Sequence, residues 1–192
     1  MSDFWLYLKL GLNHVLDWQA YDHILFLIVL VAAYTFSSWK KIVILVSLFT
    51  VGHTMSLLLA SYNVVTVSST WIEFLIPITI LIAAVYNLFT TGKNRDVESL
   101  GLFYVITIFF GLIHGFGFAS YFKIINDDNA ILPLLEFALG IEVAQLIVVL
   151  LVLLLGFIFQ TIFRFHKRDW VLVISAIVIG LVIPMLHKNW PF

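Results

Sequence analysis

Cysteine is absent from this sequence of 192 residues, and charged residues make up only 11% of it. The lack of cysteine excludes disulfide bonds, thiolate metal ligands and cysteine nucleophiles. A soluble globular domain carries about 25% charged residues, so this chain has too little polar surface to cover a water-exposed fold. The ten lysines and arginines are spread over short segments. They form no basic patch of the kind that binds nucleic acid.

Hydrophobic residues, by contrast, make up 62% of the chain, and its mean hydropathy is +1.10. A composition of this kind is typical of a protein whose solvent is the lipid bilayer. No long stretch rich in proline, glycine, serine or charge separates one part of the sequence from another. We therefore expect residues 1–192 to form a single transmembrane helical domain.

Several apolar stretches have the length of about 20 residues that a helix needs to cross the hydrocarbon layer. The clearest are Lys41 to Tyr62, Trp71 to Phe89, Leu100 to Phe122, Ile131 to Phe163 and Trp170 to His187. A shorter one runs from about Asp22 to Phe36, and the preceding Phe4 to Leu16 fits an interfacial or re-entrant helix. The sequence thus predicts an all-α integral membrane protein with a bundle of about six transmembrane helices.

The basic residues predict how the chain is oriented, because lysine and arginine are retained on the cytoplasmic side during insertion. The first, third and fifth connections hold Lys40, Lys41, Lys93, Arg95, Arg164, Lys167 and Arg168, whereas the other side holds only Lys9, Lys123 and Lys188. Both termini are therefore predicted to lie outside the cytoplasm. The outer side would also collect Asp3, Asp17, Asp22, Glu73, Asp127, Asp128 and Glu136. Such an acidic outer face would attract cations.

Three ionisable side chains on different predicted helices are expected near one depth. At 1.5 Å per residue, His53 lies ~18 Å above the cytoplasmic boundary at Lys41, and His114 reaches a similar height. Glu142 lies ~15 Å below the outer boundary by the same rise. Nearer the outer surface come His14, Asp17, Asp22, His23, Glu73 and Glu136. The inner half of the predicted spans has no comparable group, only hydroxyls such as those of Ser47, Thr50, Thr79, Thr107 and Ser175.

This layer of groups has the chemistry of a metal site. A charged side chain at mid-membrane costs at least about 2.5 kcal/mol, so such groups usually face the bundle interior and mark ion or proton pathways. Histidine nitrogen with carboxylate oxygen suits Ni, Co, Zn or Mn, whereas three methionines and no cysteine argue against Cu(I). The candidate ligands are His14, Asp22, His23, His53, His114 and Glu142, with Asp17, Glu73, Glu136 and Gln145 in secondary roles.

Structural roles are open for several of these residues. Asp22 and Asp17 suit helix caps, and His53 or His114 suits a neutral core histidine bonded to a carbonyl or to Thr50. Glu142 has fewer alternatives, because a membrane-centred carboxylate needs a proton or a partner. Gln145, one turn further along the helix, is one source of a hydrogen bond to it.

Four segments in order along the chain resemble the successive motifs of the HupE/UreJ membrane proteins. They run from Gly11-Leu-Asn-His14 through Asp22-His-Ile-Leu-Phe-Leu27, over Phe49 to Leu57, over Phe110 to Ala119, and over Phe137 to Gln145. Many members begin with a cleavable signal peptide and a longer outer segment, so the resemblance is to the shorter branch. It implies a nickel or cobalt permease of a bacterial inner membrane that accompanies hydrogenase or urease maturation proteins. By position, His14, Asp22 and His23 would form the outer metal path, with His53, His114 and Glu142 deeper.

Three functions fit these residues. The first is a permease or channel for a divalent transition metal; no P-loop is present, so ATP would be used only through a partner. The second is a zinc-dependent intramembrane hydrolase, with three protein ligands, an open fourth position, and Asp22, Glu73 or Glu136 as general base. The third is a metal-binding sensor or assembly factor that transports nothing. Lipid and the metal ion are the expected partners, and a homo-oligomer is left open.

Overall fold

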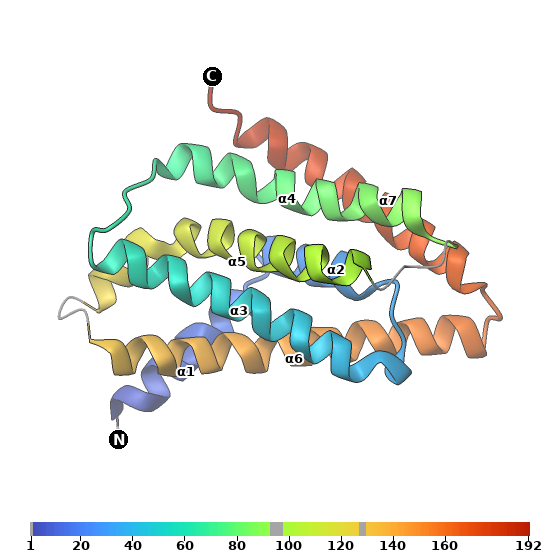
Figure 1. Cartoon of the computed structure of the whole chain (residues 1–192), viewed down its shortest axis with the longest axis horizontal. Coiled ribbons are helices and arrows are strands. Elements are labelled where there is room, and N and C mark those ends of the chain that lie inside the picture. The colour runs from blue at the N-terminus through green and yellow to red at the C-terminus, as the bar shows by residue number, and fades with distance from the viewer. Residues whose placement is uncertain (1, 93–97, 127–129) are drawn as a thin grey trace.

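Every regular element in the described part of the chain is a helix, as predicted. The computed structural model describes residues 2–92, 98–126 and 130–192, so Lys93, Arg95, Asp127 and Asp128 lie outside the described residues. The elements, drawn in Figure 1, are α1 (Ser2–Leu16), α2 (Asp22–Val31), the 3-10 helix η1 (Phe36–Ser38), α3 (Trp39–Ser61), α4 (Ser69–Thr90), α5 (Glu98–Ile125), α6 (Ile131–Thr161) and α7 (Lys167–Lys188).

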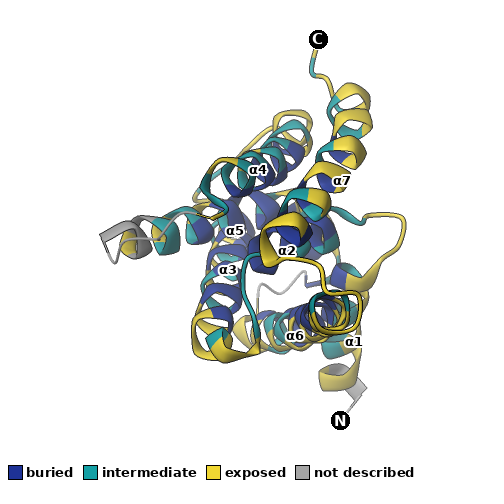
Figure 2. Cartoon of the chain, turned by 90° about the vertical axis from the view of Figure 1, so that its right-hand side faces the viewer, coloured by how far each residue is buried: buried dark blue, intermediate teal, exposed yellow. Residues whose placement is uncertain are grey.

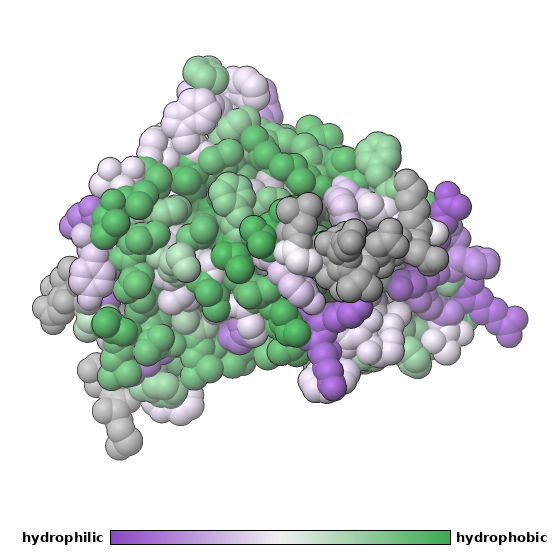
Figure 3. All heavy atoms as spheres, in the orientation of Figure 1, coloured by the Kyte–Doolittle hydropathy of each residue, from purple (hydrophilic) through white to green (hydrophobic). Residues whose placement is uncertain are grey.

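Five of these helices, α3 to α7, are long and apolar enough to cross a membrane. Their ends lie within three residues of the spans predicted from the sequence. Figure 3 shows apolar side chains over most of the visible face, with hydrophilic ones gathered mainly toward the right-hand end. Both termini lie toward the opposite, left-hand end of the bundle in Figure 1. The chain is therefore a multi-pass membrane protein.

The sixth predicted span is built differently from the expected single helix. Helix α2 ends at Val31 rather than near Phe36, and ten residues cover only ~15 Å, about half of the hydrocarbon layer. Helix α1 precedes it along α6: Gly11 touches α6 at Gly140, whereas Val31 lines a cavity with Val152. The two short helices follow one another along α6, in the place where the sequence predicted the first span.

A turn at residues 17–21 separates α1 from α2. The Asp17 carboxylate accepts a hydrogen bond of 2.8 Å from the backbone N–H of Gln19. Such side-chain bonds to nearby backbone compete with helix formation, which explains why the helix is interrupted here. The break brings the last turn of α1 and the first turn of α2 together at the same depth.

Glycine pairs let two sets of helices approach until their backbones touch. A side chain on Gly111 of α5 would collide with the carbonyl oxygen of Phe49 on α3, and one on Gly52 would collide with α5 in return. Gly11 of α1 and Gly140 of α6 form a similar reciprocal contact. Small residues of this kind are the usual device for close helix packing in membranes. These contacts hold α3 against α5 and α1 against α6. Polar side chains on facing turns of the paired helices are therefore brought close together.

Helices α4 and α7 pack as a further pair beside this centre. Pro77 in α4 has no N–H to bond the carbonyl of Glu73, and the side-chain amide of Asn189 donates to that carbonyl at 3.1 Å instead. Figure 2 shows the buried residues turned toward the middle of the bundle and the exposed ones turned outward. The bundle interior, where α2 lies surrounded by α4, α6 and α7, is therefore where polar side chains are held away from lipid.

Candidate metal centre

Four imidazoles from four helices meet in the interior of the bundle. His14 lies in the last turn of α1, His23 in the first turn of α2, His53 midway along α3 and His114 midway along α5. The ring centres of His14 and His23 are 4.6 Å apart, and His53 is 5.4 Å from the first and 5.6 Å from the second. His114 is 5.1 Å from His23. The break between α1 and α2 makes this meeting possible, because it places two histidines at one depth.

The candidate ligands form two overlapping groups. His14, His23 and His53 each offer a ligand atom, and these atoms lie within 4.8 Å of one another. Asp22, His23 and His114 satisfy the same limit. His23 is common to both groups, so an ion that moves from one group to the other would exchange two ligands and keep the third.

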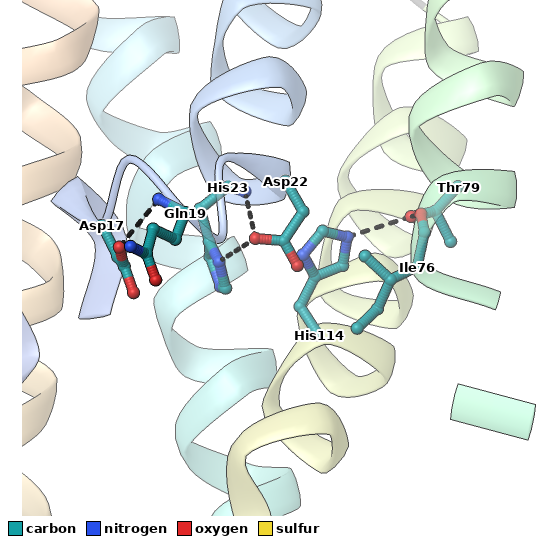
Figure 4. Close-up of polar contacts among 7 residues, drawn as sticks. All are labelled: Asp17, Gln19, Asp22, His23, Ile76, Thr79 and His114. Carbon is teal, nitrogen blue, oxygen red and sulfur yellow. Dashed lines mark hydrogen bonds and ion pairs between the residues drawn. The ribbon is translucent and has the colours of Figure 1, made fainter. Parts of the chain in front are cut away.

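Asp22 determines which nitrogen of His23 is available. The Asp22 carboxylate oxygen Oδ1 lies 3.1 Å from Nδ1 of His23 and also accepts the backbone N–H of His23 at 2.9 Å, as Figure 4 shows. An ionised carboxylate only accepts, so Nδ1 carries the proton and Nε2 carries the lone pair. That Nε2 is buried and has no hydrogen-bond partner. A carboxylate behind an imidazole in this way is the usual support of a metal-binding histidine.

Thr79 orients His114 by the same logic. The Thr79 hydroxyl donates its single proton to the carbonyl of Ile76 at 2.7 Å, and its oxygen lies 3.0 Å from Nε2 of His114 (Figure 4). The hydroxyl oxygen must then accept, so Nε2 of His114 carries the proton. Nδ1 of His114 is left with a lone pair, and it too is buried without a partner.

His53 and His14 complete the set of unused ring nitrogens. Both nitrogens of His53 and Nε2 of His14 are buried without a hydrogen-bond partner in the described structure, and His53 is 0% exposed. Leaving a buried polar atom unsatisfied costs about 1–3 kcal/mol, so several such atoms facing one another need a common explanation. Of the two deep histidines, His53 and His114, only His114 has the hydrogen bond expected of a core histidine, and its partner is Thr79. A metal ion would satisfy one nitrogen of each of His14, His23 and His53 at once.

The other predicted residues lie outside the two groups. Glu142 is half-buried and accepts hydrogen bonds from the hydroxyls of Ser47, at 2.7 Å, and Thr50. Gln145 is fully buried beside them. Asp17 and Glu73 are exposed, and Glu136 is half-buried. The structure therefore gathers five of the six candidate ligands, His14, Asp22, His23, His53 and His114, and leaves Glu142 in a separate cluster.

Two cavities reach residues of the two groups, one at His14 and one at Asp22. One of about 460 Å³ opens on His14 and is lined by Asn13, Asp17 and Tyr121 among others. A second of about 290 Å³ reaches Asp22 and is lined also by Glu73 and Lys188. Asp17 and Glu73, predicted in secondary roles, each line one of these cavities. The role of Thr79 escaped the sequence reading, because a single hydroxyl in an apolar helix does not reveal its partner.

Comparison with known proteins gives one match. The family model described as HupE / UreJ protein matches residues 1–189. No curated protein and no solved structure matches the chain.

Proposed function

The chain belongs to the HupE/UreJ family, which is associated with nickel and cobalt transport, and from this premise we propose that it is a membrane permease or channel for a divalent transition metal ion. One observation carries the proposal: His14, His23 and His53 each offer a ligand atom, and these atoms lie within 4.8 Å of one another. Each of the three rings also has a buried nitrogen that makes no hydrogen bond in the described structure. The metal ion is the transported substrate.

The ligand chemistry supports zinc, nickel or cobalt. Neutral imidazole suits these three metals, and three protein ligands leave a coordination position open for water or for the next ligand. Asp22 and Thr79 hold His23 and His114 in the tautomers that present a lone pair. A metal ion can therefore bind Nε2 of His23 and Nδ1 of His114 without displacing a proton from either nitrogen.

The overlap of the two groups supports a path rather than a single resting place. An ion held by Asp22, His23 and His114 can pass to His14 and His53 while His23 remains bound. The cavities at Asp22 and His14 provide separate approaches. With the termini outside the cytoplasm of a bacterial inner membrane, as the lysine and arginine distribution predicts, both cavities would face the acidic outer side.

The test combines metal analysis of purified protein with Ni, Co and Zn uptake into proteoliposomes. We expect saturable uptake that His53→Gln abolishes while the variant remains monodisperse in detergent. The matched control is His166→Ala, which removes a histidine with an 88% exposed side chain far from the cluster in sequence. Uptake and metal binding that survive in His53→Gln would overturn the assignment.

A zinc-dependent hydrolase is the second candidate, and one observation favours it. The three-histidine group has the ligand number of catalytic zinc sites, and the 460 Å³ cavity beside His14 would admit a substrate. Such an enzyme would retain one equivalent of zinc through dialysis and show no flux. A tightly retained ion with neither flux nor hydrolysis would instead indicate a sensor or assembly factor.

A further inference from the structure

A cluster of oxygen atoms lies between α3 and α6, apart from the histidines. The hydroxyl of Ser47 is 2.7 Å from Oε1 of Glu142, and the hydroxyl of Thr50 contacts Oε2. Thr50 Oγ1 also lies 3.0 Å from Oε1 of Gln145 and 3.2 Å from the carbonyl oxygen of Val46. Two hydroxyls therefore contact the carboxylate, and the Thr50 hydroxyl also contacts an amide oxygen and a backbone carbonyl oxygen.

The carboxylate of this cluster forms no ion pair with any residue that the structure describes. The ion pairs among the described residues join His23 to Asp22 and His166 to Asp169, and neither involves Glu142. Gln145 is 0% exposed, and its amide nitrogen has no hydrogen-bond partner in the described structure. An amide is neutral in either orientation, so Gln145 cannot balance the negative charge of Glu142. Glu142 lies eleven residues into α6, ~16 Å from its outer end. A carboxylate at this depth requires a bound cation or a proton.

The neighbouring helices supply no such charge. The titratable groups that are buried or half-buried on the helices packed against α6 include His14 on α1, Asp22 and His23 on α2, and His53 on α3, and none of them bonds to Glu142 in the described structure. The lysines of α1 and α3, Lys9, Lys40 and Lys41, are exposed. The titratable residues of α7 are exposed as well: Lys167, Arg168, Asp169, His187 and Lys188. Among the residues that the structure describes, none balances the charge of Glu142, which favours a cation from solution.

The donor atoms define the class of cation. Carboxylate, hydroxyl, amide and carbonyl oxygens are ligands for hard cations, whereas the imidazole cluster suits transition metals. In transporters, coupling sodium ions and protons are bound by such oxygens near the bilayer midplane. The two clusters of this protein therefore differ in the ions they select.

We propose that Glu142, with Ser47, Thr50 and Gln145, binds the coupling cation of transport, a sodium ion or a proton. This inference rests on the proposed function. Thr50 precedes His53 by three residues, so the two sites are about one turn apart on α3. Like charges at this separation repel, so a cation at Glu142 weakens metal binding at the histidines, and the metal weakens cation binding by the same factor. Cation arrival at Glu142 thereby promotes release of the metal.

The first part of the test uses metal-free protein, so that it does not depend on transport. Sodium-22 retention measures a bound sodium ion, and the infrared carbonyl band of a protonated carboxylic acid measures a bound proton. We expect one of these signals in the wild type and its loss in Glu142→Gln. The control is Glu136→Gln, which removes a half-buried carboxylate from the same helix outside the cluster and should retain the signal. If the wild type gives neither signal, or Glu142→Gln retains it, the proposal is overturned.

The second part measures coupling by titrating zinc into detergent-solubilised protein at pH 8. If sodium is the cation, zinc affinity should fall about tenfold when choline is replaced by saturating sodium. If the proton is the cation, zinc binding should release a proton that Glu142→Gln does not release. Ser47→Ala, a milder change, removes one oxygen near the carboxylate. A higher concentration of the coupling cation should then be needed for the same effect on zinc binding. Loss of zinc binding in folded Glu142→Gln would overturn the proposal by making Glu142 a transition-metal ligand. A wild type that binds the coupling cation but no zinc would instead contradict the proposed function.

Discussion

Thr79 on α4 holds His114 on α5 in a single tautomer. The Thr79 hydroxyl donates to the carbonyl of Ile76 at 2.7 Å, and its oxygen therefore receives the Nε2 proton of His114 at 3.0 Å. This contact joins α4 to α5 between residues that lie 35 positions apart in the sequence. It also directs the lone pair of Nδ1 away from Thr79. An uncharged hydroxyl thus performs for His114 the role that the Asp22 carboxylate performs for His23.

Thr79→Val should weaken metal binding without removing a ligand. The variant keeps the shape of the side chain but loses the acceptor, so His114 is free to adopt the other tautomer. Loss of such a supporting partner typically reduces metal affinity about 10–100-fold. Competition titration with a chelating dye would measure the change. Thr107→Val is the control, because the buried Thr107 hydroxyl bonds to the carbonyl of Phe103 in its own helix. Equal effects from the two variants would contradict the orienting role of Thr79.

Asp22→Ala should also reduce metal affinity, and Asp22→Asn should reduce it less. The asparagine oxygen still accepts the Nδ1 proton of His23, whereas alanine leaves that proton without an acceptor. The absorption spectrum of bound Co(II), which reports coordination geometry, would follow both variants. Asp17→Asn, in the exposed turn nearby, should leave the spectrum unchanged. A Co(II) spectrum of Asp22→Ala identical to that of the wild type would exclude Asp22 as both ligand and support.

Gly111→Ala should separate α3 from α5 and disrupt the cluster. The added methyl group would collide with the Phe49 carbonyl oxygen, and overpacking of this kind costs about 1–3 kcal/mol. We expect a lower midpoint of thermal unfolding in detergent. Metal binding should weaken as well, because His53 on α3 and His114 on α5 would move apart with their helices. The matched control is Gly101→Ala on the same helix, where the added atom meets nothing within 4 Å. Unfolding midpoints that do not differ between the two variants would contradict the close packing.

Asn13→Cys should react with a membrane-impermeant maleimide added from outside the cell. The natural sequence has no cysteine, so a single introduced thiol gives an unambiguous signal. Asn13 is exposed and lines the cavity that opens on His14. His166→Cys, in the connection before α7, should react only after the membrane is opened, because that connection is predicted to be cytoplasmic. Labelling of the second variant in intact cells would reverse the predicted orientation.

Much of the fold was readable from the sequence, since long apolar runs determine spanning helices whatever their neighbours are. The ends of α3 to α7 were predicted within three residues for this reason. The same reading identified the histidines, because an imidazole inside an apolar stretch is visible without any knowledge of packing. The break between Leu16 and Asp22 was predicted as well, but the end of the following helix was not. Helix α2 ends at Val31 rather than near Phe36, because the apolar run continues into a turn that hydropathy does not reveal.

The amino-acid sequence by itself determined the approximate position of each polar group along its own helix, because the rise of a helix is constant at 1.5 Å per residue. It did not determine which groups at one depth face each other. His14, His23, His53 and His114 meet because glycine contacts set how α3 lies on α5 and α1 on α6, and because the α1–α2 break aligns two helix ends. Glu142, predicted at the same depth, faces Ser47 and Thr50 instead. Rotation of a helix about its axis depends on contacts with its neighbours, and only the tertiary structure contains them.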